Sequence, residues 1–321
     1  MVNRENLLIA LLGGRTENPV WAEMNISEGL KRHFAGEIPS GLTFEEHFGI
    51  SNYVCGAICP PGIVELGTTA GGKTTVKKGL LFTRADLKRI AENFPNPNTK
   101  ALYDALNGKL RNAPKNLAKC VITDLCAGSA LVSMGVDGFS YALTDDREFV
   151  KEVFLRYAEW SAKVHKNLCV MGFDFIWSGG DIAFGSAPFF SPEVFREVIL
   201  PAMRIGASTI SLPWVYHSDG NLSPILKELL SLGMNALHPF EPGAMDIRAV
   251  KKRYGNKLCV IGNVSVDLLA RGTPEEIELE TAGLIRDLHP CGGYIVSSSN
   301  TITDFVEPCN FRAMSNCVKS F

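Results

Sequence analysis

The second half of the chain alternates between short apolar runs and amphipathic segments. The segments between the runs have the apolar spacing of helices, and several carry helix-end signals. Ser191 stands before Pro192, Asp246 and Gly255 flank one segment, and Thr273 begins a Thr-x-x-Glu capping box. Such alternation is typical of a parallel sheet covered by helices. The apolar runs, which we expect to be strands, lie at 173–183, 209–220, 234–243, 257–265 and 292–300.

This pattern predicts an α/β fold, and a (β/α)₈ TIM barrel is favoured because the chain exceeds the roughly 250 residues that a barrel needs. We expect a single domain over 1–321, with an N-terminal extension over 1–85 and the barrel core over 86–321. Within the extension, 62–82 alternates around a Gly-Gly pair as a β-hairpin does, and 18–26 could be an early barrel strand. A doubly wound open sheet is the alternative, but no G-x-G-x-x-G follows an early strand.

Composition narrows the class of protein. The formal net charge is −2, from 32 basic and 34 acidic residues, which disfavours nucleic acid or an anionic membrane as a general partner. Nine cysteines, an odd number, are scattered along the chain, which disfavours a disulfide scaffold and favours a reducing cytoplasm. No run approaches the ~18 apolar residues of a membrane span, and no signal peptide is recognisable. We therefore expect a cytoplasmic protein. A homo-oligomer is compatible with the sequence.

Polar side chains follow each of these apolar runs. Because the carboxyl ends of parallel strands open onto one mouth, we expect them to share a cleft. Each has a structural explanation of its own: Asp181 could cap a helix, His217 could be a core histidine, and Asp219 could hold its turn. Recurrence on successive strands favours a functional site instead. The candidates are Asp181, His217, Asp219, His238, Glu241, Asn263, Ser298 and Asn300.

His217, Asp219 and Glu241 are the expected catalytic residues. Their nitrogen and oxygen atoms suit a divalent metal such as zinc, with His217 and Glu241 as the expected ligands. Without a metal, a histidine oriented by a carboxylate can protonate a leaving group. No cysteine stands at these strand ends, so a thiolate-rich zinc site is not expected.

Three segments resemble the uroporphyrinogen decarboxylase superfamily. They are "FFSPEVFREVILPAMRIG" (189–206), "YHSDGNLSPILKELLSLGMNALHPFEPGAMDIRAVKKRYGNKLCVIGNVSVDLLARGTPEEI" (216–277) and "GGYIVSSSN" (292–300). The resemblance runs from about residue 120 to the end and implies a (β/α)₈ barrel. The superfamily includes the decarboxylase of haem biosynthesis and the cobalamin-dependent methyltransferases.

Two departures separate this chain from branches of that superfamily. The decarboxylase has an Arg-Gln-Ala-Gly-Arg-Tyr segment for a substrate that bears eight carboxylates and needs several cations. This chain has "NPVWAEMNISEG" (18–29), with no arginine between Arg15 and Arg32. The coenzyme M methyltransferases have a His-x-Cys zinc motif and a late cysteine. Here His217 matches, but Asp219 takes the cysteine position and the serines at 297–299 take the late one.

The segments at 68–90 and 129–160 are most similar to the substrate:corrinoid methyltransferases, such as those that demethylate aryl methyl ethers in anaerobes. This resemblance implies methyl transfer from a small methylated substrate to a Co(I) corrinoid carried by a partner protein. His217 would then be a metal ligand or proton donor, with Asp219 orienting it. The side chains that would bind the substrate are Asp181, His238, Asn263, Ser298 and Asn300. The alternatives are a decarboxylase or lyase acting on a smaller substrate, and a non-catalytic barrel.

Overall fold

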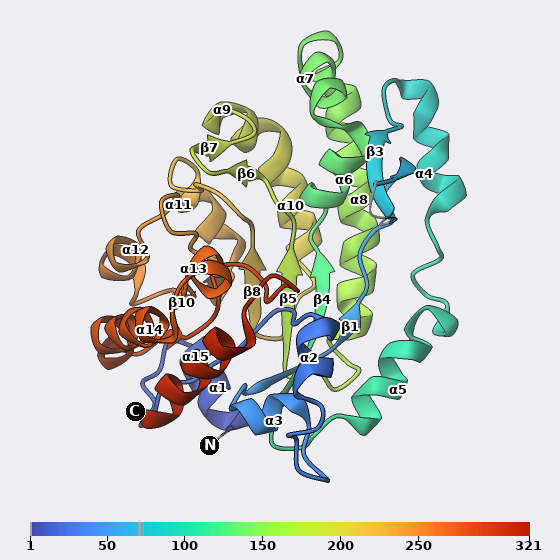
Figure 1. Cartoon of the computed structure of the whole chain (residues 1–321). Helices are drawn as coiled ribbons and strands as arrows, with labels where there is room; N and C mark the ends of the chain where they lie inside the picture. The colour runs from blue at the N-terminus through green and yellow to red at the C-terminus, as the bar shows by residue number, and fades with distance from the viewer. Residues whose placement is uncertain (1, 70–71, 73) are drawn as a thin grey trace.

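A computed structural model describes residues 2–69, 72 and 74–321. Within these residues, the centre is a curled sheet of seven strands that pair in parallel, in the order β1-β4-β5-β8-β9-β10-β11 (Figure 1). The strands are β1 (Asn52–Ala57), β4 (Ala118–Asp124), β5 (Phe175–Gly179), β8 (Trp214–His217), β9 (Ala236–His238), β10 (Cys259–Ile261) and β11 (Tyr294–Ile295).

Trp21 joins the two edges of this sheet. It forms parallel bridges with Ile50, just before β1, and with Val296, just after β11. The N–H of Ser51 donates to the Trp21 carbonyl over 2.8 Å, and the N–H of Val296 donates to the Val20 carbonyl over 2.8 Å. The extended segment around Trp21 therefore lies where an eighth strand would stand, and the architecture is an α/β fold like that of a TIM barrel.

The expected extension over 1–85 does not lie outside the sheet, because β1 pairs with β4 within it. Residues 62–82, expected to form a hairpin, contain β2 (Val64–Thr68) and β3 (Thr74–Gly79), which pair antiparallel. Gly71 of the expected Gly-Gly turn lies outside the described residues. A second antiparallel pair, β6 (Ala183–Phe184) and β7 (Ala187–Pro188), follows β5.

Helices cover the outside of the sheet (Figure 1). The helix α8 begins after the N-cap Asp146 and packs against α10. Asp246 and Thr273 cap α12 and α14 as their sequence signals predict. The α-helices are α1 (Arg4–Leu11), α2 (Glu28–Phe34), α3 (Phe44–Phe48), α4 (Leu87–Asn93), α5 (Asp104–Asn112), α6 (Ala127–Met134), α7 (Val136–Asp145), α8 (Arg147–Leu168), α9 (Pro192–Val194), α10 (Leu200–Ala207), α11 (Leu226–Leu229), α12 (Ile247–Tyr254), α13 (Val266–Arg271), α14 (Pro274–Leu288) and α15 (Pro308–Ser320).

The strands place alternate side chains inside and outside the curled sheet. On β5, Phe175 and Trp177 belong to the inner apolar cluster, whereas Ile176 packs in the outer layer with the helices. Leu7 and Leu11 of α1 join the inner cluster. Since α1 also hydrogen-bonds near the start of β4, where the N–H of Arg4 donates to Asn116 O, this helix closes the amino-terminal end of the sheet. The carboxyl ends of the strands are left for a site.

In the described part of the chain, no helix is both long enough and apolar enough to span a membrane.

Candidate functional site

His217 ends β8 and lies at the centre of the polar cluster. Its side chain is almost fully buried. The Nδ1 atom lies 2.8 Å from Nδ1 of His238, which ends the neighbouring strand β9. The Nε2 atom faces two carboxylates, Oδ1 of Asp181 at 3.6 Å and Oδ1 of Asp219 at 3.7 Å. His217 thus contacts the histidine of the neighbouring strand through one ring nitrogen and faces two carboxylates with the other.

Backbone and side-chain hydrogen bonds hold the acids in place. The N–H of Asp219 donates to Oδ1 of Asp181 over 3.0 Å. The N–H of Gly220 donates to Oε2 of Glu241 over 2.7 Å, and Nδ2 of Asn300 donates to Oδ2 of Asp219 over 2.7 Å. Four loops that follow different strands therefore meet at this cluster, as the sequence predicts.

The cluster concentrates negative charge without a cationic side chain. Burial, together with the charges of Asp181 and Glu241, raises the pKa of Asp219 to about 7, against the hydrogen bond from Asn300. Burial lowers the pKa of His217 to about 4, although Asp181 opposes the shift. Among the described residues, no Lys or Arg forms an ion pair with Asp181, Asp219 or Glu241. Because the imidazole is neutral at pH 7, a bound cation would relieve the repulsion.

Asp181, His217 and Asp219 fit a divalent metal. One donor atom from each lies within 4.8 Å of the others. Ligands about 2.0–2.2 Å from a zinc ion in tetrahedral geometry are about 3.3–3.6 Å apart, close to the distances from Nε2 to the two carboxylates. Oδ1 of Asp219 is also buried without a hydrogen-bond partner, so it is free to bind a cation. The donor set is nitrogen and oxygen with no cysteine, and the expectation that Glu241 is a ligand stays a prediction.

Glu23, which was not among the predicted site residues, accepts hydrogen bonds from a second group of buried side chains. It follows the segment that joins the sheet edges and is fully buried. Its Oε1 accepts from Nε1 of Trp21 (2.7 Å) and the N–H of Ser298 (2.8 Å). Its Oε2 accepts from Oγ of Ser298 (2.7 Å) and Oγ of Ser297 (3.3 Å). Burial raises the pKa of Glu23 to about 7, and these hydrogen bonds limit the rise.

Because Glu23 is buried, we expect the protein to lose stability as the pH rises from 5 to 8. A carboxyl whose pKa is near 4.5 when unfolded and about 7 when folded binds its proton more tightly in the folded state. Its stabilising contribution is therefore complete below pH 4.5 and is lost as pH rises through 7. Between pH 5 and 8 we expect wild type to lose about 2–3 kcal/mol of unfolding free energy relative to Glu23→Gln.

Urea unfolding of both proteins at the two pH values measures this difference. Glu45→Gln, in a mostly buried glutamate paired with Lys31, is the control that should follow wild type. Parallel pH dependence in wild type and Glu23→Gln would contradict the assignment.

Asp124 is a second acid not anticipated from the sequence. It ends β4, and burial raises its pKa. Its oxygens accept from the N–H groups of Cys126 (2.8 Å) and Ser129 (2.7 Å) at the start of α6. The apolar run 117–122 that precedes it carries the same signal as the other strands. Its contacts are those of a helix-capping side chain.

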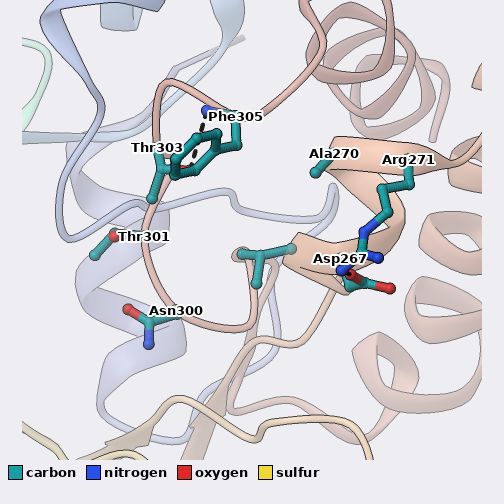
Figure 2. A pocket seen from close by; sticks show the side chains of 8 residues that line it. Asp267, Ala270, Arg271, Asn300, Thr301, Thr303 and Phe305 are labelled. Atoms are coloured by element: carbon teal, nitrogen blue, oxygen red, sulfur yellow. Dashed lines mark hydrogen bonds and ion pairs between the residues drawn. The ribbon is translucent and has the colours of Figure 1, made fainter. Parts of the chain in front are cut away.

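Two expected substrate-binding residues lie at the rim. Asn263 donates to the Phe240 carbonyl over 2.8 Å and lines a surface pocket beside α12 and α14. None of its described hydrogen bonds reaches His217, and its role in substrate binding stays a prediction. Asn300 lines an open pocket of about 630 Å³ between α13 and the loop before α15 (Figure 2). In Figure 2 the exposed ring of Phe305 stands on that loop, opposite Ala270 of α13. Asn300 thus connects the acids with a solvent-accessible recess.

Fold and site together define a TIM-barrel-like protein of the α/β class, with titratable groups gathered where its strands end. Residues 64–321 match the family model "Uroporphyrinogen decarboxylase (URO-D)". The match covers most of the chain, which therefore belongs to the uroporphyrinogen decarboxylase family.

Relatives with known names resemble parts of this chain. A methylated-thiol–coenzyme M methyltransferase of Methanosarcina mazei is 31% identical over 93 residues, which are 29% of this chain and 24% of that protein. A uroporphyrinogen decarboxylase of Pseudoalteromonas translucida is 32% identical over 77 residues, which are 24% of this chain and 22% of that protein. The matches thus span less than a quarter of either relative.

A solved structure extends the likeness to the whole fold. A methyltransferase from Methanosarcina mazei superposes with a TM-score of 0.78 at 16% identity, covering 100% of this chain and 99% of that chain. At this identity the likeness shows the fold alone.

Proposed function

We propose that this protein transfers a methyl group from a small methylated substrate to a Co(I) corrinoid carried by a partner protein. The observation that carries the proposal is the cluster of Asp181, His217 and Asp219 at the carboxyl ends of the strands. The methylated-thiol–coenzyme M methyltransferase among the relatives supports the same reaction class.

The chemistry explains why such a cluster is needed. Co(I) is a strong nucleophile, but an alkoxide or phenoxide is a poor leaving group, so charge on the departing atom must be neutralised. A divalent metal held by His217, Asp219 and Asp181 would supply this as a Lewis acid, an effect worth several kcal/mol. His217, neutral at pH 7, would offer the metal its lone pair. Asn300 would hold Asp219, and Glu241 would hold the loop at Gly220.

Oxygen in place of sulfur around the metal favours an oxygen-bearing methyl donor. The relative named above acts on methylated thiols, whereas the cluster here has Asp219 and no cysteine. Carboxylates make a harder, less electron-donating site than thiolates, which suits polarisation of an ether oxygen. We therefore propose an aryl methyl ether as the donor class to test first.

The direct test mixes the zinc-supplemented protein with a reduced corrinoid protein and one methyl donor at a time. The expected result is the methyl-Co(III) spectrum with an aryl methyl ether and the release of the free phenol. Methylated thiols and methylamines serve as the comparison donors. Release of carbon dioxide from a carboxylated substrate without methyl transfer would instead support a decarboxylase, as in the second relative. Ligand binding with neither reaction would support a non-catalytic barrel.

A further inference from the structure

A chain of buried polar groups links Glu23 to His217. From Oε2 of Glu23 it passes to Oγ of Ser297 at 3.3 Å, and from there to Nε2 of His238 at 3.4 Å. Nδ1 of His238 then meets Nδ1 of His217 at 2.8 Å. Glu23, Ser297 and His238 are all buried. The proposed reaction assigns no role to Glu23, Ser297 or the contact between the two imidazoles.

The facing Nδ1 atoms require the two histidines to be in complementary states. When both rings are neutral, one Nδ1 must carry the proton and the other must accept it. The proton therefore resides on Nε2 of one ring and on Nδ1 of the other. The groups that determine which nitrogen of His238 carries its proton therefore also determine which nitrogen of His217 does.

The surroundings of His238 decide between the two arrangements. A carboxylate at Glu23 can only accept, so the Ser297 hydroxyl donates to it and offers its lone pair to Nε2 of His238. Burial and the neighbouring His217 lower the pKa of His238, and a hydrogen bond with the Ser298 backbone opposes this shift. Nε2 of His238 therefore carries the proton, and its Nδ1 accepts from Nδ1 of His217. Nε2 of His217 is left with its lone pair.

We propose that Glu23 is a positioning residue that, through Ser297 and His238, holds Nε2 of His217 unprotonated toward Asp181 and Asp219. The inference rests on the proposed function in taking His217 as the working side chain, and it makes that side chain a ligand rather than a proton donor. The distances agree with this. An Nε2–H group would be drawn to hydrogen-bond distance of a carboxylate, whereas Nε2 of His217 lies 3.6 Å from Asp181 and 3.7 Å from Asp219.

Glu23→Gln tests this with little change of shape. Oε1 of Glu23 accepts from the indole N–H of Trp21 and the backbone N–H of Ser298, neither of which can become an acceptor. The glutamine oxygen must therefore take that position, and its NH₂ group must face the serine hydroxyls. The amide then donates to Ser297, whose own proton turns to Nε2 of His238. This reverses the chain and places a proton on Nε2 of His217.

The measurement is the ¹⁵N shift of both ring nitrogens in histidine-labelled protein at pH 8, above the pKa of Glu23. In wild type we expect His217 with the proton on Nδ1 and Nε2 free. In Glu23→Gln we expect the pattern to invert, and the affinity for Co²⁺ alone to fall about tenfold to a hundredfold, as when a metal ligand loses its orienting partner. Glu45→Gln, on the same pocket as Glu23, should match wild type in both readouts.

Ser297→Ala is the second variant, and it tests the proposal on its own if Glu23→Gln does not fold. It removes the hydroxyl between Glu23 and His238 and leaves the Ser298 backbone, so the same changes are expected with smaller size. In the double variant, Glu23→Gln should add nothing to Ser297→Ala. An unchanged His217 pattern with unchanged Co²⁺ affinity, in whichever variant folds, overturns the proposal. Neither readout needs a methyl donor or a corrinoid, so they stand apart from a failure of the proposed reaction.

Discussion

Replacing His217 with alanine is expected to lower the rate of methyl transfer about a thousandfold. The imidazole is the nitrogen donor of the proposed metal site. Loss of about 4 kcal/mol of Lewis-acid stabilisation corresponds to about a thousandfold in rate. Its loss leaves Asp181 and Asp219 facing each other without a neutral partner. The initial rate of methyl-Co(III) formation measures the effect, and circular dichroism confirms that the variant is folded.

His33→Ala is the matched control, because His33 is an exposed histidine on α2. It should keep the wild-type rate. A folded His217→Ala protein that retained a tenth or more of the activity would remove His217 from the mechanism.

Replacing Asp219 with asparagine is expected to weaken Zn²⁺ or Co²⁺ binding about a hundredfold. Asparagine preserves size and can keep a contact with Asn300, but it removes the charge and the buried Oδ1 acceptor that lacks a partner. Carboxylate ligands bind as anions, so the neutral amide is a poor substitute. Calorimetric titration with each metal measures the change.

Three further variants sharpen the test of the metal site. Asp219→Cys supplies a thiolate and should retain Zn²⁺ affinity, with a sulfur-to-cobalt charge-transfer band on Co²⁺ loading. Asp267→Asn, in an exposed aspartate paired with Arg271 on α13, should bind as wild type does. Glu241→Gln decides whether Glu241 is a ligand, since a loss as large as that of Asp219→Asn requires direct coordination. Equal affinity in wild type and Asp219→Asn would argue against the site.

Much of the polar cluster could be predicted because its signal is local. Asp181, His217 and Glu241 each follow an apolar run, and parallel strands bring their carboxyl ends to one mouth whatever the detailed packing. The same signal precedes Asp124 in the run 117–122, yet the acid itself caps α6. Local pattern alone does not separate a capping acid from one in the site.

The roles within the cluster depended on contacts that no local pattern contains. Glu23 and Ser298 are 275 residues apart in the chain and hydrogen-bond directly. Asn263, in contrast, stands at a strand end like the others but turns to the Phe240 carbonyl. Which way a side chain points at a strand end depends on the loops that pack over it.

The sequence by itself determined the α/β class, the helix caps, the order of the later strands and the polar residues at their ends, because periodicity and capping act over a few neighbouring residues. The tertiary structure alone decided that Trp21 joins the sheet edges, that His217 faces His238 on one side and two acids on the other, and that Glu23 lies behind them. The contacts of Trp21 and Glu23 arise because the curled sheet brings its first and last segments together, and that of His217 with His238 arises because β8 and β9 are neighbours. The resulting burial shifts the pKa values of His217, Asp219 and Glu23.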